Sequence, residues 1–190
     1  MSAALDAATA TGTVASWYLA LVAAVALERV VELVVSKRHV ESALLGGGVE
    51  HGRRHYPAMV LLHTGLLVGC VAEVLLADRP FVPALGLPML ALVLAAQGLR
   101  WWCIATLGGR WTTRVIVLPG APLVERGPYR WLSHPNYLAV VVEGLALPLV
   151  HTAWVTATVF TLLNAVLLLG FRIPVERRAL AAAAPERTRA

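Results

Sequence analysis

The sequence has few charged residues for its length. Asp, Glu, Lys and Arg make up only 14% of its 190 residues, whereas a soluble globular domain carries about 25%. Hydrophobic residues make up 58%, and the mean hydropathy is +0.72. This composition excludes an ordinary water-soluble domain and favours a chain embedded in a lipid bilayer.

Several motifs are also absent. The two cysteines, Cys70 and Cys103, lack the CxxC or Cys/His spacing of a redox or metal pair, so we interpret them as packing residues. Neither HExxH nor a paired-histidine motif is present, and we predict no metal site. The absence of a GxGxxG loop argues only against a Rossmann-type cofactor site. The N-terminus lacks the basic start of a secretory signal, so we expect a retained first helix.

Long uncharged apolar runs set the expected architecture. They cover residues 7–27, 55–72, 80–99 and 144–171, each close to or above the ~18 residues that suggest a membrane span. Residues 134–171 would measure about 57 Å as one helix, against a hydrocarbon core of about 30 Å. We expect this stretch to fold back near Pro148 to Thr152.

We therefore predict an all-α integral membrane protein with about five transmembrane helices, a cofactor-binding loop and a C-terminal helix. The first three helices are expected at about Val14–Val35, Pro57–Ala77 and Pro83–Thr106. Residues 1–106 would hold these helices, and residues 107–190 would form the catalytic region of the same integrated domain. Between 107 and 130, Gly and Pro turns surround a β-prone stretch from Trp111 to Val117, which predicts a non-helical loop.

The basic residues predict the orientation of the chain. The net charge of +5 arises from residues between the apolar runs and in the tail, so positive-inside bias explains it better than nucleic-acid binding. We expect a bacterial cytoplasmic membrane location with the N-terminus outside and the C-terminus in the cytoplasm. The basic residues assigned to the cytoplasmic side are Lys37, Arg38, Arg53, Arg54, Arg110, Arg114, Arg126, Arg130, Arg172, Arg177, Arg178, Arg187 and Arg189, against Arg79 outside.

Charged residues also fall within or near the expected spans. Such charges usually face protein or a water-filled cavity. Interhelical pairing is one interpretation, which we favour, and a proton or ion pathway is the other. The residues concerned are Glu28, Arg29, Glu32, Glu73, Arg100 and Glu143, and we interpret His63 as an interhelical hydrogen-bonding residue.

Two polar clusters flank the last expected helical hairpin. The first runs from Gly127 to Tyr137, and the second from Arg172 to Glu176. Antiparallel helices would bring the clusters together at one membrane face. The aromatic residues Tyr129 and Tyr137 could contact an adenine or a sulfonium, while Glu176 could bind ribose hydroxyls or an ammonium group. Arg172 could hold a carboxylate or an anionic substrate oxygen.

This combination resembles the isoprenylcysteine carboxyl methyltransferase family of integral membrane enzymes. The family hallmark is a Gly-x-Tyr-x-x-x-Arg-His-Pro-x-Tyr segment followed by Arg-x-x-x-Glu, and the spacings from Tyr129 to His134 and from Arg172 to Glu176 agree with it. Ser133 stands where the family usually has Arg, and Arg177 where an acidic run usually continues.

The resemblance implies an S-adenosylmethionine-dependent O-methyltransferase. It places Arg172 near the acceptor as the catalytic residue. The cofactor-binding residues that it implies are Ala121, Pro122, Leu123, Val124, Tyr129, His134, Pro135, Asn136, Tyr137 and Glu176.

Within the family, the chain looks most like a bacterial branch that methylates alkylpyrones or alkylresorcinols made by type III polyketide synthases. Its features include Glu28-Arg29-x-x-Glu32, His55-Tyr56-Pro57 and Leu107-Gly108-x-x-Trp111-Thr112-Thr113. The implied partners are this lipophilic acceptor and the membrane lipids. Carboxyl methylation of a prenylcysteine-like acid is an alternative. A small transporter or ion-pathway subunit built on Glu28, Glu32, Glu73 and Glu143 is an alternative from another class.

Overall fold

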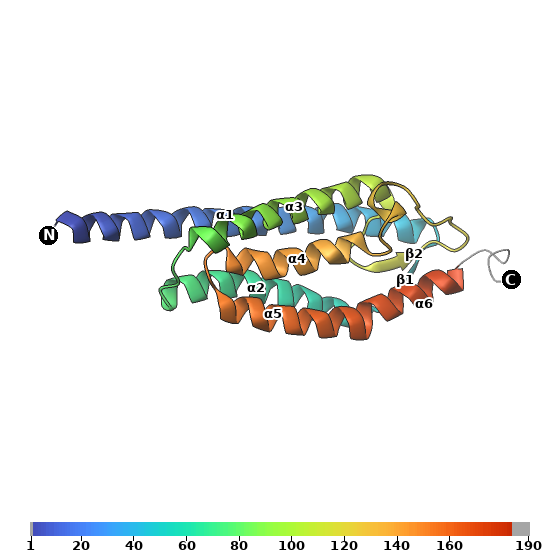
Figure 1. Ribbon diagram of the computed structural model, residues 1–190. Helices are drawn as coiled ribbons and strands as arrows, with labels where there is room; N and C mark the ends of the chain where they lie inside the picture. The colour runs from blue at the N-terminus through green and yellow to red at the C-terminus, as the bar shows by residue number, and fades with distance from the viewer. Residues whose placement is uncertain (1, 184–190) are drawn as a thin grey trace.

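The computed structural model describes residues 2–183, with side chains from residue 16 onward. The chain is mostly helical, and its helices pack lengthwise with a small two-stranded sheet at one end (Figure 1). Arg187 and Arg189, which the sequence assigns to the cytoplasmic tail, lie outside the described residues. The elements are α1 (Ser2–Leu45), β1 (Val49–His51), α2 (Tyr56–Leu76), α3 (Pro83–Leu107), β2 (Val115–Val117), α4 (Pro135–Leu149), α5 (Trp154–Leu167) and α6 (Ile173–Ala183).

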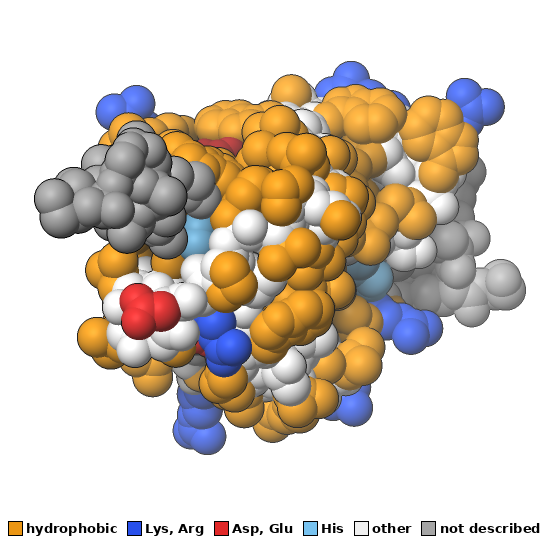
Figure 2. All heavy atoms as spheres, turned by 60° about the vertical axis from the view of Figure 1, so that its left-hand side comes forward, with side chains coloured by type: hydrophobic (Ala, Val, Ile, Leu, Met, Phe, Trp, Pro, Cys, Tyr) orange, Lys and Arg blue, Asp and Glu red, His pale blue; other side chains and the backbone are white. Residues whose placement is uncertain are grey.

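Three helical segments in the described part of the chain are long and apolar enough to cross a membrane. They are Arg53–Leu76, Pro83–Arg110 and Trp154–Ala183, and α4 is a shorter apolar helix. The prediction of an integral membrane protein is therefore supported. The all-α prediction holds for most of the described chain but not for the β1–β2 sheet, and the number of about five transmembrane helices stays a prediction. The surface in Figure 2 agrees, because hydrophobic side chains cover most of this face and the charged ones are scattered.

The first helix is longer than the sequence suggested. We expected it to end near Val35, but α1 continues through the basic residues to Leu45. Nothing between residues 36 and 45 breaks a helix, and the chain turns only at Gly46-Gly47-Gly48, where Gly47 has φ +84°. The N-terminal part of α1 projects beyond the other helices (Figure 1).

The other helix predictions agree closely with the structure. Helices α2 and α3 begin and end within one residue of the expected bounds. The predicted reversal also occurs, because α4 ends at Leu149 and α5 begins at Trp154. Thr152 in this turn has φ +53°, and its hydroxyl donates to the Pro80 carbonyl at 2.7 Å, which ties the turn to the α2–α3 connection.

The β-prone stretch forms only a short strand. Strand β2 pairs antiparallel with β1, with Glu50 opposite Ile116. The sheet therefore joins the connection after α1 to the long loop after α3. The predicted non-helical loop is largely confirmed, since short 3₁₀ turns at 108–110 and 127–130 are its only helical parts.

Close approach of α4 and α5 depends on Gly144. A Cβ atom at this position would overlap the ring of Phe160, which is only 3% exposed. The Tyr18 hydroxyl donates to the Leu147 carbonyl at 3.1 Å and ties α1 to the same helix. Helix α4 therefore packs against α3 and α5 and is also bonded to α1.

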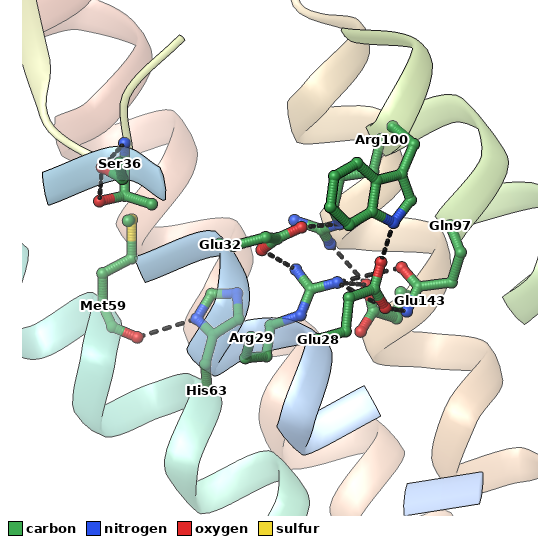
Figure 3. Close-up of polar contacts among 11 residues, drawn as sticks. Glu28, Arg29, Glu32, Ser36, Met59, His63, Gln97, Arg100 and Glu143 are labelled. Carbon is green, nitrogen blue, oxygen red and sulfur yellow. Dashed lines mark hydrogen bonds and ion pairs between the residues drawn. The ribbon is translucent and has the colours of Figure 1, made fainter. Parts of the chain in front are cut away.

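A network of charged and amide side chains joins α1, α3 and α4 inside the bundle (Figure 3). Arg29 lies 2.7 Å from Glu32 and 3.5 Å from Glu143, while Arg100 lies 2.5 Å from Glu143 and 3.6 Å from Glu32. Gln97 bridges the carboxylate of Glu28 and the guanidinium of Arg29. The interhelical pairing that we favoured from the sequence is confirmed for these residues. The interpretation of His63 as an interhelical hydrogen-bonding residue is wrong, because its Nδ1 bonds to the Met59 carbonyl of its own helix α2.

Glu73 is separate from this network. Its carboxylate accepts hydrogen bonds from the backbone N–H groups of Val155 and Thr156 and lies 2.9 Å from Arg79. It thus satisfies donors at the start of α5, which no side chain of α5 itself caps. The four carboxylates that a transport pathway would use are therefore engaged in contacts that join helices.

We expect Gly144→Ala to lower the free energy of unfolding by about 1–3 kcal/mol, because the added methyl group overpacks the α4–α5 contact. A thermal melt in detergent would measure this change. Gly98→Ala is a matched control, because an added Cβ there meets nothing within 4 Å. Equal melting temperatures for the two variants would contradict the close-packing argument.

Arg100→Leu should destabilise the protein by about 3–5 kcal/mol, because Glu143 would lose its nearest cation while staying buried. The double variant Arg100→Leu/Glu143→Leu should lose less, since the uncompensated carboxylate is gone. Melting temperatures of the two variants test this order. A double variant less stable than Arg100→Leu would show that the pair itself supplies the stability.

Candidate functional site

A cavity of about 580 Å³ lies at the end of the bundle that carries the sheet. The long loop from Leu107 to Ser133, the start of α4 and the segment around α6 surround it. The two polar clusters meet at this cavity, as the sequence predicts. Its polar and aromatic lining residues include Arg110, Trp111, Thr112, Arg114, Glu125, Tyr129, Ser133, His134, Asn136, Tyr137, Arg172, Glu176 and Arg177.

Proline and glycine position the loop residues. Pro128 is the second residue of the 3₁₀ turn at 127–130, and Pro135 is the first residue of α4, so the missing N–H group of each proline costs no helical hydrogen bond. Gly127 has φ +58°, and a Cβ atom there would collide with Thr106 at the end of α3. Only glycine lets the turn approach α3 this closely, so Tyr129 and His134 are placed on the cavity wall.

Arg172 is held in the cavity by an irregular helix. The five residues Leu168–Arg172 form a π-helical turn between α5 and α6. Pro174 explains it, because its ring would clash with the Gly170 carbonyl in a regular α-helix. Arg172 is only 5% exposed, and its Nη2 donates to the Thr113 carbonyl at 2.9 Å. The turn thus fixes a buried cation against the long loop.

Glu176 is the centre of a second group of contacts. The hydroxyl of Tyr137 donates to its Oε2, and His134 Nδ1 lies 3.7 Å from its Oε1. The rings of His134 and Tyr137 stack with centroids 5.3 Å apart, and the Arg172 guanidinium lies 6.0 Å from the Tyr137 ring centre. Tyr137 therefore connects the carboxylate side of the cavity to the guanidinium side.

The long loop supplies the outer wall. Arg110 donates to the Pro122 carbonyl at 2.8 Å and holds residues 121–124 over the cavity. Burial raises the pKa of the Tyr129 phenol, so this hydroxyl stays protonated near neutral pH. The wall therefore presents backbone, apolar groups and one neutral phenol beside the charged groups of α6.

Nearly all of the sequence-predicted site residues meet at this cavity. The residues that line it are Ala121, Pro122, Leu123, Val124, Tyr129, His134, Asn136, Tyr137, Arg172 and Glu176. Pro135 does not line it, because its ring is fully buried at the start of α4. Ser133 and Arg177, the two departures from the family pattern, also lie on the wall. That these residues bind a cofactor stays a prediction.

Several other wall residues were not among the predicted site residues. Thr112 and Arg114 come from the stretch before β2, and Leu180 comes from α6. The Trp-Thr-Thr motif pointed to the first of these, but the approach of β2 to α6 depends on sheet pairing that a three-residue strand does not reveal. Within the described part of the chain, no group of His, Cys, Asp or Glu side chains could hold a metal ion.

Comparisons with known proteins support the same region. The family described as isoprenylcysteine carboxyl methyltransferase matches residues 89–182, which include most of the cavity wall. An uncharacterized protein of Bacillus subtilis, YpbQ, is 38% identical over 161 residues, covering 84% of this chain and 94% of that protein. An uncharacterized protein of Haemophilus influenzae is 25% identical over 155 residues, covering 80% of this chain and 88% of that protein.

No solved structure matches the chain. The family match includes most residues of the cavity wall, and the similarity to the Bacillus protein extends over 84% of this chain. The protein belongs to the isoprenylcysteine carboxyl methyltransferase family.

Proposed function

We propose that this protein is an S-adenosylmethionine-dependent O-methyltransferase for a lipophilic acceptor. The observation that carries the proposal is the convergence of Glu176, Tyr137, His134 and Arg172 on one cavity, at the end of the bundle that the family match covers. Family membership supports methyl transfer as the reaction class.

The cavity fits the proposed cofactor. Its volume of about 580 Å³ is within the range of small-molecule sites. Glu176 offers a carboxylate for an ammonium group or ribose hydroxyls, and the Tyr129 and Tyr137 rings offer faces for adenine or a sulfonium. Asn136 adds a buried side-chain oxygen that has no hydrogen-bond partner in the described structure. S-Adenosylmethionine, when bound, supplies an electrophilic methyl group.

Arg172 is the residue that we assign to the acceptor oxygen. Its Nη2 is held by the Thr113 carbonyl, while its Nε is buried without a hydrogen-bond partner. A fixed guanidinium stabilises negative charge on an attacking oxygen at no cost of reorganisation. The walls also exclude water and align the reactants, which is the main contribution that a protein makes to an in-line displacement.

The proposed acceptor is a long-chain alkylpyrone or alkylresorcinol. A polar ring with an alkyl chain suits a polar cavity set at the end of an apolar bundle, and a type III polyketide synthase would supply such a molecule. We place this end of the bundle in the cytoplasm, because basic residues of both connections and of α6 gather there. The N-terminus would then lie outside.

Binding of S-adenosylhomocysteine to detergent-purified protein tests the cofactor site. We expect saturable calorimetric binding by the wild type. Glu176→Gln and His134→Ala should each weaken it by about tenfold or more, because a charge-assisted contact is worth roughly 1.5–3 kcal/mol. Arg178→Gln is the matched control, since Arg178 is exposed on the same helix and does not line the cavity. Absence of binding by folded wild type would refute the proposed function.

Acceptor preference tests the reaction itself. We expect faster methylation of an alkylresorcinol than of a prenylcysteine analogue in the same detergent, measured by transfer of a radiolabelled methyl group. Arg172→Lys should lower the rate about 100-fold with little effect on S-adenosylhomocysteine affinity, because lysine lacks the planar guanidinium fork. The opposite acceptor preference would favour the prenylcysteine alternative, and an unaffected rate in Arg172→Lys would remove that residue from the reaction.

A further inference from the structure

A second, smaller pocket of about 140 Å³ adjoins the cavity on its membrane side. The two spaces meet at the residues that line both, which are Trp111, Thr112, Asn136, Tyr137 and Arg172. The inner pocket is also bounded by the charged network, by one face of α2 and by two residues of the α5 region. Those further lining residues include Arg29, Glu32, Leu33, Tyr56, Met59, Val60, His63, Thr64, Arg100, Asn164 and Leu168.

The inner pocket gathers buried polar atoms that the described protein leaves without hydrogen-bond partners. Glu32, Arg100, Asn164 and Arg172 are each at most 5% exposed. Asn164 Oδ1 and Arg172 Nε have no such partner, and Asn136 Oδ1 is a third atom of this kind. Glu32 Oε1 and Arg100 Nε also lack a hydrogen bond, but they face each other as an ion pair at 3.6 Å. Buried polar groups are rarely left unpaired because each costs about 1–3 kcal/mol, so this concentration indicates a pocket that takes a polar ligand.

His63 brings a free lone pair to the same pocket. Its Nδ1 lies 2.8 Å from the Met59 carbonyl oxygen, which can only accept a hydrogen bond, so Nδ1 carries the proton. In the neutral ring Nε2 is therefore unprotonated. Figure 3 shows the ring turned towards Arg29 and Glu32, with its other nitrogen on their side. The charged groups around it are Arg29 and Glu32 on α1, Arg100 on α3, Glu143 on α4 and Arg172.

The dimensions and the rim of the pocket limit its ligand. A cavity of roughly 150 Å³ accommodates one benzene ring, so a pocket of about 140 Å³ admits a single six-membered ring. Its rim includes Leu33 of α1 and Val60 of α2, which are 40% and 39% exposed on the apolar exterior. An alkyl chain attached to the ring can leave between α1 and α2 into the lipid.

We propose that the inner pocket binds the hydroxylated ring of the acceptor and that His63 Nε2 accepts the proton of its reacting hydroxyl. This inference rests on the proposed function and specifies its acceptor as a single phenolic or enolic ring with an alkyl tail. Asn164 and Glu32 hold the ring's other oxygen substituents, and Arg172 faces the reacting oxygen from the side shared with the cavity.

The proton transfer balances within the pocket. The O–H bond of the acceptor breaks, its electron pair stays on oxygen, and the lone pair of Nε2 forms the new N–H bond. The resulting oxyanion lies against Arg172, and its negative charge offsets the positive charge of the imidazolium formed in the same pocket. After methylation of the oxygen and release of product, the imidazolium returns its proton to water, which regenerates the neutral ring.

A carboxylic acid would use this pocket poorly. Its proton is already lost at neutral pH, so it has nothing to give to His63. The proton-accepting nitrogen of His63 is therefore useful for a phenolic or enolic acceptor and has no role for a prenylcysteine-like acid.

Equilibrium binding of radiolabelled pentadecylresorcinol to detergent-solubilised protein, saturated with S-adenosylhomocysteine, tests the site without turnover. Asn164→Leu, which fills the pocket, and Val60→Trp, which narrows its exposed rim, should each weaken acceptor binding by about tenfold or more. Affinity for S-adenosylhomocysteine should stay within about threefold of wild type, which also shows that the variants fold. If Asn164→Leu does not fold, acceptor binding by Val60→Trp tests the proposal on its own.

Gly65→Leu is the matched control. Gly65 lines a separate apolar groove of about 590 Å³ between α2 and α5, and an added Cβ there meets nothing within 4 Å. We expect unchanged acceptor binding in this variant. Loss of binding in Gly65→Leu, with Asn164→Leu and Val60→Trp unaffected, would place the acceptor in that groove and overturn the proposal. Normal S-adenosylhomocysteine binding in that case would leave the proposed function intact.

The role of His63 as a base is tested by comparing methylation rates of a neutral acceptor and an already ionised acceptor. His63→Gln should lower methylation of pentadecylresorcinol by about 100-fold, the contribution typical of a positioned base. It should lower methylation of a nitro-substituted, already ionised alkylresorcinol by less than about fivefold, because that acceptor has no proton to remove. Equal losses with both acceptors would show that His63 serves only the architecture of the pocket.

Discussion

Charge pairing inside the bundle is the constraint on which the rest of the structure depends. A lipid bilayer cannot solvate a guanidinium or a carboxylate, so Arg29 and Arg100 must face Glu32 and Glu143 across α1, α3 and α4. This pairing fixes the rotation and depth of three helices at once. It also provides a polar inner surface in a protein whose exterior is apolar, and the inner pocket opens on that surface.

The helical framework was largely predictable because the bilayer imposes a simple rule on length and polarity. The bounds of α2 and α3 and the reversal before Trp154 follow from apolar run lengths and from proline and glycine positions. The end of α1 was not predictable in this way. Lys37 and Arg38 suggest an interface in the sequence, but a charged residue does not stop a helix, whereas three consecutive glycines do.

The candidate site was predictable where its residues share a motif and hidden where tertiary packing creates it. Tyr129, His134 and Glu176 could be named from spacing, and the hairpin of α4 and α5 explains why they meet. His63 and Asn164 carry no local signal, because each is a single polar residue in an apolar helix. Their significance comes from a shared pocket and from polar atoms left without partners, which only the packed structure reveals.

The π-helical turn at Leu168–Arg172 has a consequence for how the site can vary. An extra residue per turn changes the angular phase of everything that follows by about 100°. Arg172 ends this turn and Glu176 follows it, so the turn sets the direction of the guanidinium and the carboxylate together relative to α5. Loss of a single residue between Leu168 and Phe171 would keep every side chain of the site and still rotate both charges about the helix axis. The number of residues between α5 and Glu176 therefore matters for the direction of the charged side chains as well as for their identity.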